Sequence, residues 1–284
     1  MSVHFQVAAI TDEFSADLET AARAMAEIGI AGAELRVVDG KNILDLGDEE
    51  LEAAIRTVRA NGLEIVSIAS PLLKCVLPDT PEIDARFQKD VFASAHTFAD
   101  QPRLAARALD IARRTEARII RVFSYWRTVE PKACFERVVT ALRGLAETAA
   151  REGVVIGLEN EQACNVATAE EAARVLAAVG HPGLKVVWDP ANALVSGEDP
   201  FPEGYGWLDP GRIAHVHAKD CGFENGKLTW AALGDGVIDW RGQLAALRRD
   251  GYTGWISLET HWEGPAGDKL EASRICGRRL VAMA

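Results

Sequence analysis

Acidic and imidazole side chains stand at the ends of four consecutive segments that have the composition of β-strands. Glu159, Asp189 and Glu259 end three of these segments, and the remaining one carries His215 and His217. One charged strand end is commonly just solvated, but three carboxylates that converge repel one another and are costly to desolvate unless a cation lies among them. Carboxylates with one imidazole suit Mn²⁺, Mg²⁺ or Co²⁺ better than a cysteine-rich zinc site does. The pattern therefore predicts a divalent metal ion.

Two strand-like segments, residues 32–36 and 213–218, place several charged residues on one face of each strand or just beyond its end. Residues two apart on a strand point the same way, so Glu34 lies with Arg36, and His215 lies with His217 and Lys219. We expect Arg36 and Lys219 to hold oxyanions or hydroxyl groups of a substrate, with Glu34 orienting Arg36. The alternative, that they are ordinary charges at the rim of the fold, carries nearly equal weight.

Short β-branched segments alternate with helical patterns from one end of the chain to the other. This alternation predicts parallel strands with helical crossovers, and eight repeats predict an α/β fold, a single (β/α)8 TIM barrel over residues 1–284. An open doubly wound sheet is disfavoured because no G-x-G-x-x-G loop follows an early strand. In such barrels the working residues stand at the carboxyl ends of the strands. The predicted strands are Phe5–Ile10, Gly32–Arg36, Glu64–Ala69, Arg118–Phe123, Val154–Glu159, Leu184–Asp189, Ile213–Ala218 and Trp255–Glu259.

The helical spacing of apolar residues predicts the crossovers between these strands. Thr168 is expected to cap one helix, with Glu171 three residues later as in a capping box, and Asp48 is expected to cap another. The predicted helices are Asp17–Ile28, Asp48–Ala60, Leu104–Thr115, Phe135–Arg151, Ala169–Val179 and Asp239–Asp250.

One irregular stretch interrupts the alternation after the third strand. Val76–Gln101 is rich in Pro and Asp, and it is too long for a plain loop between a strand and a helix. We interpret residues 76–101 as an insertion at the barrel mouth and as a candidate lid.

Composition limits the compartment and the partners of the protein. The chain has 31 Lys and Arg against 42 Asp and Glu, a formal net charge of −11, so nucleic acid is a poor default partner. Five cysteines without a C-x-x-C pair fit a reducing compartment. The start, MSVHFQVAAITDEFS, lacks the features of a signal peptide, and no window has the ~18 apolar residues of a membrane span. We expect a cytoplasmic protein that acts on a small molecule without a membrane partner, and we leave a homo-oligomer open.

Motifs at the predicted strand ends resemble one known family. GLEN, WDPAN, HVHAKD and SLETHW, with GAELR on the second strand and LGDGVIDW before the last helix, resemble the xylose-isomerase-like TIM-barrel superfamily of sugar phosphate isomerases and epimerases. That group includes D-tagatose 3-epimerase, hydroxypyruvate isomerase and inosose dehydratase. The resemblance implies one divalent ion, Mn²⁺ first with Mg²⁺, Co²⁺ or Zn²⁺ as alternatives, bound by Glu159, Asp189, His217 and Glu259. His215 is then a neighbour that packs in the strand or contacts substrate.

The resemblance also implies a reaction. A keto-sugar would place its carbonyl and adjacent hydroxyl on the metal, which stabilises the enediolate formed when a proton leaves the neighbouring carbon. Glu159 and Glu259, on well-separated strands, would transfer that proton as the catalytic residues. The expected activity is that of a sugar or sugar phosphate isomerase or epimerase. The alternative is a lyase, a dehydratase of a keto-cyclitol or keto-glycoside, which expels a hydroxyl one carbon further.

Three positions depart from the ketose 3-epimerase pattern. Asn192 stands where those enzymes have a His that contacts substrate, and we expect Asn192 to bind substrate here. Asn165 replaces a second Glu, and Phe223 replaces an Arg. These departures argue against a free-ketose 3-epimerase and leave the substrate, including its phosphorylation, open.

Two other classes of protein are weaker alternatives. An apurinic endonuclease would need several more histidines at the early and middle strand ends, where this chain has Ser70 and Tyr125 and only six histidines in all. The negative net charge also disfavours DNA. A non-catalytic sugar-binding barrel would not need a glutamate on both flanking strands.

Overall fold

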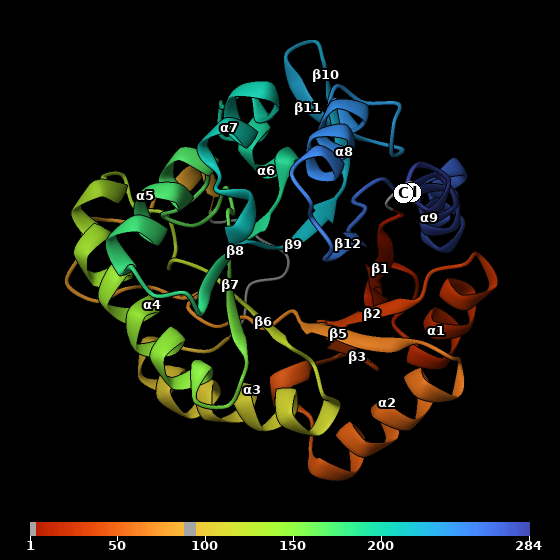
Figure 1. The fold of residues 1–284 in the computed structure, drawn as a ribbon, viewed down its shortest axis with the longest axis horizontal. Helices are drawn as coiled ribbons and strands as arrows, with labels where there is room; N and C mark the ends of the chain where they lie inside the picture. The colour runs from red at the N-terminus through yellow and green to blue at the C-terminus, as the bar shows by residue number, and fades with distance from the viewer. Residues whose placement is uncertain (1–3, 88–94) are drawn as a thin grey trace.

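The computed structural model describes residues 4–87 and 95–284 and shows a closed barrel of parallel strands inside a ring of helices (Figure 1). Around the barrel the strands follow the order β1-β12-β9-β8-β7-β6-β5-β2, so the first strand pairs with the last. The predicted (β/α)8 TIM barrel is therefore confirmed. The barrel strands are β1 (Gln6–Ile10), β2 (Gly32–Leu35), β5 (Glu64–Ile68), β6 (Ile119–Val122), β7 (Val155–Glu159), β8 (Leu184–Trp188), β9 (Ile213–Ala218) and β12 (Trp255–Leu258).

Amphipathic helices cover the outside of the barrel (Figure 1). In α3, Leu104, Ala108 and Ile111 recur at helical spacing and are buried, which turns this face of the helix toward β5 and β6. The helices are α1 (Leu18–Glu27), α2 (Asp48–Ala60), α3 (Gln101–Thr115), α4 (Phe135–Ala150), α5 (Ala169–Val179), α6 (Pro190–Val195), α7 (Tyr205–Trp207), α8 (Trp240–Arg249) and α9 (Lys269–Met283).

Two helix starts test the predicted caps. The Thr168 side chain accepts a hydrogen bond from the backbone N–H of Glu171, as predicted. Asp48 is instead the first residue of α2, and Gly47 occupies the cap position, where its N–H donates to Glu50 Oε2 at 2.8 Å. The prediction for Asp48 was wrong by one residue, because the Glu50 carboxylate reaches back to this helix end.

Several elements escaped prediction from the sequence. The buried face of α9 carries Cys276 and Leu280 but also Ala272, Ser273 and Gly277, so small and polar residues interrupt the apolar stripe. The motif LGDGVIDW consequently precedes α8 and not the last helix, which corrects that expectation. Two short antiparallel hairpins were also missed; they pair β3 (Val37–Val38) with β4 (Lys41–Asn42) and β10 (Asp220–Glu224) with β11 (Lys227–Ala231).

Asp220 anchors the second hairpin to the loop that follows it. Its carboxylate accepts hydrogen bonds from the backbone N–H groups of Cys221, Gly234, Gly236 and Ile238. A Cβ at Gly236 would lie 2.1 Å from Asp220 Oδ1, so only glycine fits there. This loop therefore wraps tightly around a buried carboxylate directly after Lys219.

The barrel interior is tightly packed beside Gly157, two residues before Glu159 on β7. A Cβ at Gly157 would lie 2.7 Å from Val187 Cγ2 and 3.2 Å from Ile119 Cγ2. Residues two apart share a face of the strand, so this packing also fixes the place from which Glu159 projects.

The candidate lid at Val76–Gln101 is described only in part, because 88–94 lie outside the described residues. Its described flanks form 3-10 turns at Ala85–Phe87 and Phe98–Asp100. The lid role stays a prediction. Over residues 4–87 and 95–284, no helix is both long and apolar enough to cross a membrane.

Candidate metal centre

Four acidic or imidazole residues converge at the carboxyl ends of neighbouring barrel strands. Glu159 ends β7, Asp189 follows β8, His217 lies in β9 and Glu259 follows β12. All four side chains are buried, and one ligand atom from each lies within 4.8 Å of the others. Closure of the barrel thus brings together the four residues that the sequence singled out as ligands of a divalent ion.

His217 lies between the two glutamates of this group. Its Nδ1 is 3.2 Å from Glu159 Oε1 and 3.3 Å from Glu259 Oε2. Burial acts to lower the pKa of His217, but the carboxylates of Glu34 and Glu159 outweigh burial and raise the pKa well above 6.5. The ring is therefore protonated at neutral pH while no metal ion is bound.

Basic side chains offset the charges of the three carboxylates. Lys219 Nζ lies 2.8 Å from Asp189 Oδ2 and 2.9 Å from Glu259 Oε2. Arg121 Nη1 lies 3.1 Å from Glu159 Oε2. Each ligand carboxylate therefore has at least one cation beside it, as buried charges require.

The pKa values of the three carboxyl groups differ because their neighbours differ. Burial raises the pKa of Asp189 to about 7, against the opposing effect of Lys219. Burial also acts to raise the pKa of Glu259, but Lys219 and His217 outweigh it and hold that pKa well below its usual range. At Glu159, His217 and Arg121 together outweigh burial and lower the pKa. Both glutamates are therefore ionised and able to accept a proton.

The donor set fits a divalent metal ion. Three carboxylates and one imidazole are ligands typical of Mn²⁺, Mg²⁺ and catalytic Zn²⁺ sites. Glu159 Oε2 and Asp189 Oδ2 are buried, and in the described part of the chain each faces a cationic nitrogen, Arg121 Nη1 at 3.1 Å and Lys219 Nζ at 2.8 Å. Both oxygens therefore lie where the surroundings already favour a positive charge, which also suits a metal cation.

Arg36 is held by acidic residues around its guanidinium. Its Nη2 lies 2.9 Å from Asp12 Oδ2 and also contacts Glu13, while its Nη1 lies 3.1 Å from Glu259 Oε1. The expectation that Glu34 orients Arg36 was wrong, because the Glu34 carboxylate is directed at the two histidines of β9. These contacts give Arg36 the task of holding Glu259 in place.

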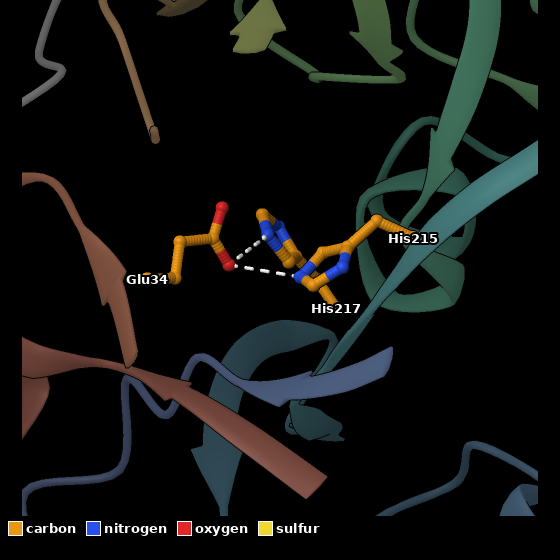
Figure 2. Close-up of side chains that lie close together, drawn as sticks. All are labelled: Glu34, His215 and His217. Atoms are coloured by element: carbon orange, nitrogen blue, oxygen red, sulfur yellow. Dashed lines mark hydrogen bonds and ion pairs between the residues drawn. The ribbon is translucent and has the colours of Figure 1, made fainter. Parts of the chain in front are cut away.

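Glu34, His215 and His217 form a second buried cluster inside the barrel (Figure 2). Glu34 Oε2 is 3.0 Å from His215 Nε2 and 3.1 Å from His217 Nε2, and Ser67 Oγ donates to Glu34 Oε1 at 3.1 Å. Burial acts to raise the pKa of Glu34, but the two histidines outweigh it and hold the pKa well below its usual range. Glu34, which we expected at the substrate side beside Arg36, and His215, for which strand packing and substrate contact were both open, are thus hydrogen-bonded to each other.

Asn192 and Asn160 tie the ends of β7 and β8 together. Asp189 caps α6 and accepts a hydrogen bond from the N–H of Asn192 at 2.9 Å. Asn192 Nδ2 donates to the Asn160 carbonyl at 2.9 Å and lies 3.4 Å from Glu159 Oε1. Asn160 Nδ2 donates in turn to the Asp189 carbonyl at 2.8 Å. Asn192, expected to bind substrate, therefore also supports two of the ligand residues.

The other two departures from the ketose 3-epimerase pattern lie in different surroundings. Asn165 is buried, accepts a hydrogen bond from Thr128 N at 3.1 Å and donates to Ser124 O at 3.0 Å. Phe223 is 53% exposed on the β10–β11 hairpin. Asn165 thus serves the packing of a loop, and neither side chain carries a charge.

Arg121 is the site residue that sequence reasoning missed most clearly. It lies in the apolar strand β6, its side chain is 6% exposed, and its guanidinium carbon lies 4.6 Å from the centre of the Phe123 ring. A charged residue at a buried position of an apolar strand is the signal that could have identified it. Asp12 and Glu13, which hold Arg36, follow β1 without any such signal.

Aromatic and imidazole rings border the group near Lys219. The rings of Trp230 and His261 lie 4.6 Å apart, and Lys219 Nζ is 5.9 Å from the centre of the Trp230 ring. Burial and the positive charge of Lys219 lower the pKa of His261 to about 3. His261 is therefore neutral near pH 7 and offers a polar, uncharged ring beside the site.

Comparisons with known proteins place this barrel in a family. Inosose dehydratase of Lacticaseibacillus casei is 27% identical over 154 residues, 48% of this chain and 50% of the relative, so the chain spans about half the length of the curated relatives it matches. The solved structure of the IOLI protein with a zinc atom has a TM-score of 0.74 at 16% identity over 98% of both chains. D-psicose 3-epimerase of Clostridium cellulolyticum H10 has a TM-score of 0.69 at 17% identity over 98% of this chain and 96% of the epimerase. The family model described as xylose isomerase-like TIM barrel matches residues 22–279, and the chain belongs to that family.

Proposed function

We propose that this protein is a divalent-metal-dependent dehydratase, a lyase that removes water from a cyclic polyol ketone. The observation that carries the proposal is the buried group of Glu159, Asp189, His217 and Glu259 within 4.8 Å, with two ionised glutamates in it. The match to inosose dehydratases supports a keto-cyclitol as substrate. Dehydration is therefore the first candidate reaction, in place of the isomerisation that we expected first from the sequence.

The four residues of this group would hold the metal ion. When bound, a divalent ion supplies a Lewis acid that stabilises negative charge on the carbonyl and hydroxyl oxygens of the substrate. The zinc atom in the solved structure of the IOLI protein, which has a similar fold, supports metal binding by this barrel. Mn²⁺ stays our first choice, with Mg²⁺, Co²⁺ and Zn²⁺ as alternatives, because the ligands are mainly carboxylates.

The two glutamates project from different strands, so they can contact different sides of a bound substrate. Glu159 ends β7 and Glu259 follows β12, with β8 and β9 between them in the barrel. One glutamate takes the proton from the carbon next to the carbonyl, which leaves an enediolate. That glutamate then gives the proton to the hydroxyl on the next carbon, and the hydroxyl leaves as water. The reaction needs no other reactant.

A second candidate reaction uses the same residues. If the other glutamate returns a proton to the opposite face of the same carbon, the configuration inverts and the product is an epimer. The structural similarity to D-psicose 3-epimerase supports this candidate at the level of the fold. Epimerisation differs from dehydration in one respect that can be measured, because it loses no water.

The test uses the purified protein with Mn²⁺, an inosose as substrate and D₂O as solvent. We expect proton NMR to show deuterium entering next to the carbonyl, and mass spectrometry to show a product lighter by one water molecule. Deuterium uptake with inversion and no loss of water would replace the dehydratase by the epimerase. An inosose panel, and then a keto-sugar panel, without any deuterium uptake would contradict both.

A further inference from the structure

The carboxylate of Glu34 lies between two imidazole rings inside the barrel (Figure 2). It projects from β2, is fully buried and places one oxygen, Oε2, within 3.0 Å of His215 Nε2 and 3.1 Å of His217 Nε2. A carboxylate can only accept hydrogen bonds, so each Nε2 must carry a proton to donate. Ser67 Oγ donates to the other oxygen of Glu34 and completes its hydrogen bonding on that side.

The second nitrogen of the His217 ring faces the candidate metal group. Nδ1 lies 3.2 Å from Glu159 Oε1 and 3.3 Å from Glu259 Oε2, on the side of the ring away from the Glu34 contact. A neutral imidazole with its proton on Nε2 has its free lone pair on Nδ1. We propose that Glu34 is a positioning residue that keeps the proton of His217 on Nε2 and so presents Nδ1 to the metal ion of the proposed function, on which this inference rests.

A second metal ion is the competing explanation of the same cluster. Glu34, His215 and His217 also offer three ligand atoms within 4.8 Å of one another. His217 would then need both ring nitrogens as ligands and would have to lose its last ring proton. If Glu34 only accepts a hydrogen bond, His217 keeps the proton on Nε2 and donates it to the carboxylate. The geometry therefore favours one metal ion, with Glu34 behind its histidine ligand.

The experiment compares the wild type with Glu34→Gln and with Ser67→Ala as matched control. Glu34→Gln keeps the shape of the side chain but replaces the charged acceptor, so we expect Zn²⁺ to bind about 10- to 100-fold more weakly, the usual effect of losing such a partner. Ser67→Ala removes only the bond to the other oxygen of Glu34, and we expect a change of less than about threefold. Titration calorimetry gives the affinities, and metal analysis gives the number of ions per chain.

Nitrogen-15 NMR of labelled histidine supplies a readout that a merely structural role would not change. In the wild type we expect a proton on His217 Nε2 with and without Zn²⁺, and a Zn²⁺-dependent shift of Nδ1. In Glu34→Gln we expect the Nε2–H signal to weaken or to be shared with Nδ1. Zn²⁺ on Nε2, two ions per chain in the wild type, or unchanged Zn²⁺ affinity in Glu34→Gln would overturn the proposal. A wild type without bound metal would overturn the proposed function, while the Nε2–H signals would still decide whether Glu34 orients the ring.

Discussion

The two glutamates of the site are supported in different ways. Both glutamates contact His217. Beyond that ring, Glu159 ends a barrel strand and faces one guanidinium, that of Arg121 from the adjacent strand β6, and one neutral amide, that of Asn192. Glu259 lies just past a barrel strand and faces two cations, the guanidinium of Arg36 and the ammonium of Lys219. The additional cation beside Glu259 makes this carboxylate the weaker base of the two. We infer that Glu159 is the glutamate that starts the reaction.

The two arginines differ as strongly as the glutamates that they face. Arg36 is shared among Asp12, Glu13 and Glu259, and it reaches Glu259 from β2 across β1. Arg121 pairs with a single glutamate, and its Nη2 donates to the carbonyl of Ala69 at 3.0 Å. The Glu259 side of the site thus depends on a buried ion-pair network, whereas the Glu159 side depends on one pair and on backbone contacts.

The largest effect is expected on stability. Arg36→Met leaves the buried carboxylates of Glu13 and Glu259 and the partly buried one of Asp12 without their shared cation, and should destabilise the fold by about 3–5 kcal/mol. Arg121→Met removes a single pair and should cost clearly less. Urea unfolding of both variants measures the difference, with Arg249→Met as a surface control whose midpoint should not move. Equal losses from Arg36→Met and Arg121→Met would break the comparison.

Turnover is the next property to separate the two glutamates. Glu159→Gln and Glu259→Gln can both still ligate through an amide oxygen but cannot act as bases, so each should lower turnover by at least ~10²-fold. If Glu159 starts the reaction, only Glu159→Gln should also lose the exchange of substrate hydrogen with D₂O. NMR of the substrate in D₂O checks this, with circular dichroism to confirm that both variants fold. Exchange that survives in Glu159→Gln and is lost in Glu259→Gln would reverse the assignment.

Metal affinity should separate the two histidines. His217→Ala removes a proposed ligand, whereas His215→Ala removes only the second donor to Glu34 and should weaken binding by about tenfold at most. Metal analysis after dialysis, and thermal melts with and without a chelator, measure this order because a bound ion stabilises the folded state. The reverse order would show that His215 is the ligand.

The pH dependence of metal binding should follow from the protonation of His217. Its pKa is raised well above 6.5, so the ring carries two protons near pH 7, and one must leave Nδ1 before that nitrogen can bind metal. Metal uptake should therefore release the proton on His217 Nδ1 and, below about pH 7, a second proton from Asp189, whose pKa is about 7. Affinity should rise with pH by up to about tenfold per pH unit for each proton released, until the pKa of His217 is passed. Calorimetry in buffers of different ionisation enthalpy counts the protons. Affinity that is flat from pH 6 to about pH 8 would contradict this account.

Much of the site could be predicted from local sequence patterns. A barrel strand is a short β-branched run that ends where its polar residues begin, so the order of residue types alone places Glu159, Asp189 and Glu259 at strand ends. Their shared charge then predicts a cation among them. Local pattern failed at α9, because Ala272, Ser273 and Gly277 interrupt its buried face and leave only Cys276 and Leu280 as larger apolar residues there.

The sequence by itself determined the order of the eight barrel strands and of six of the helices between them, the class of fold and the chemical type of the ligand set, since each of these follows from short local patterns in the chain. Only the tertiary structure decided which charge faces which. Arg36 meets Glu259 across 223 residues of sequence, and Glu34 meets His217 across 183. Such pairs form when the barrel closes β1 against β12 and its interior excludes water, so that each buried charge must find a partner wherever the closed barrel provides one.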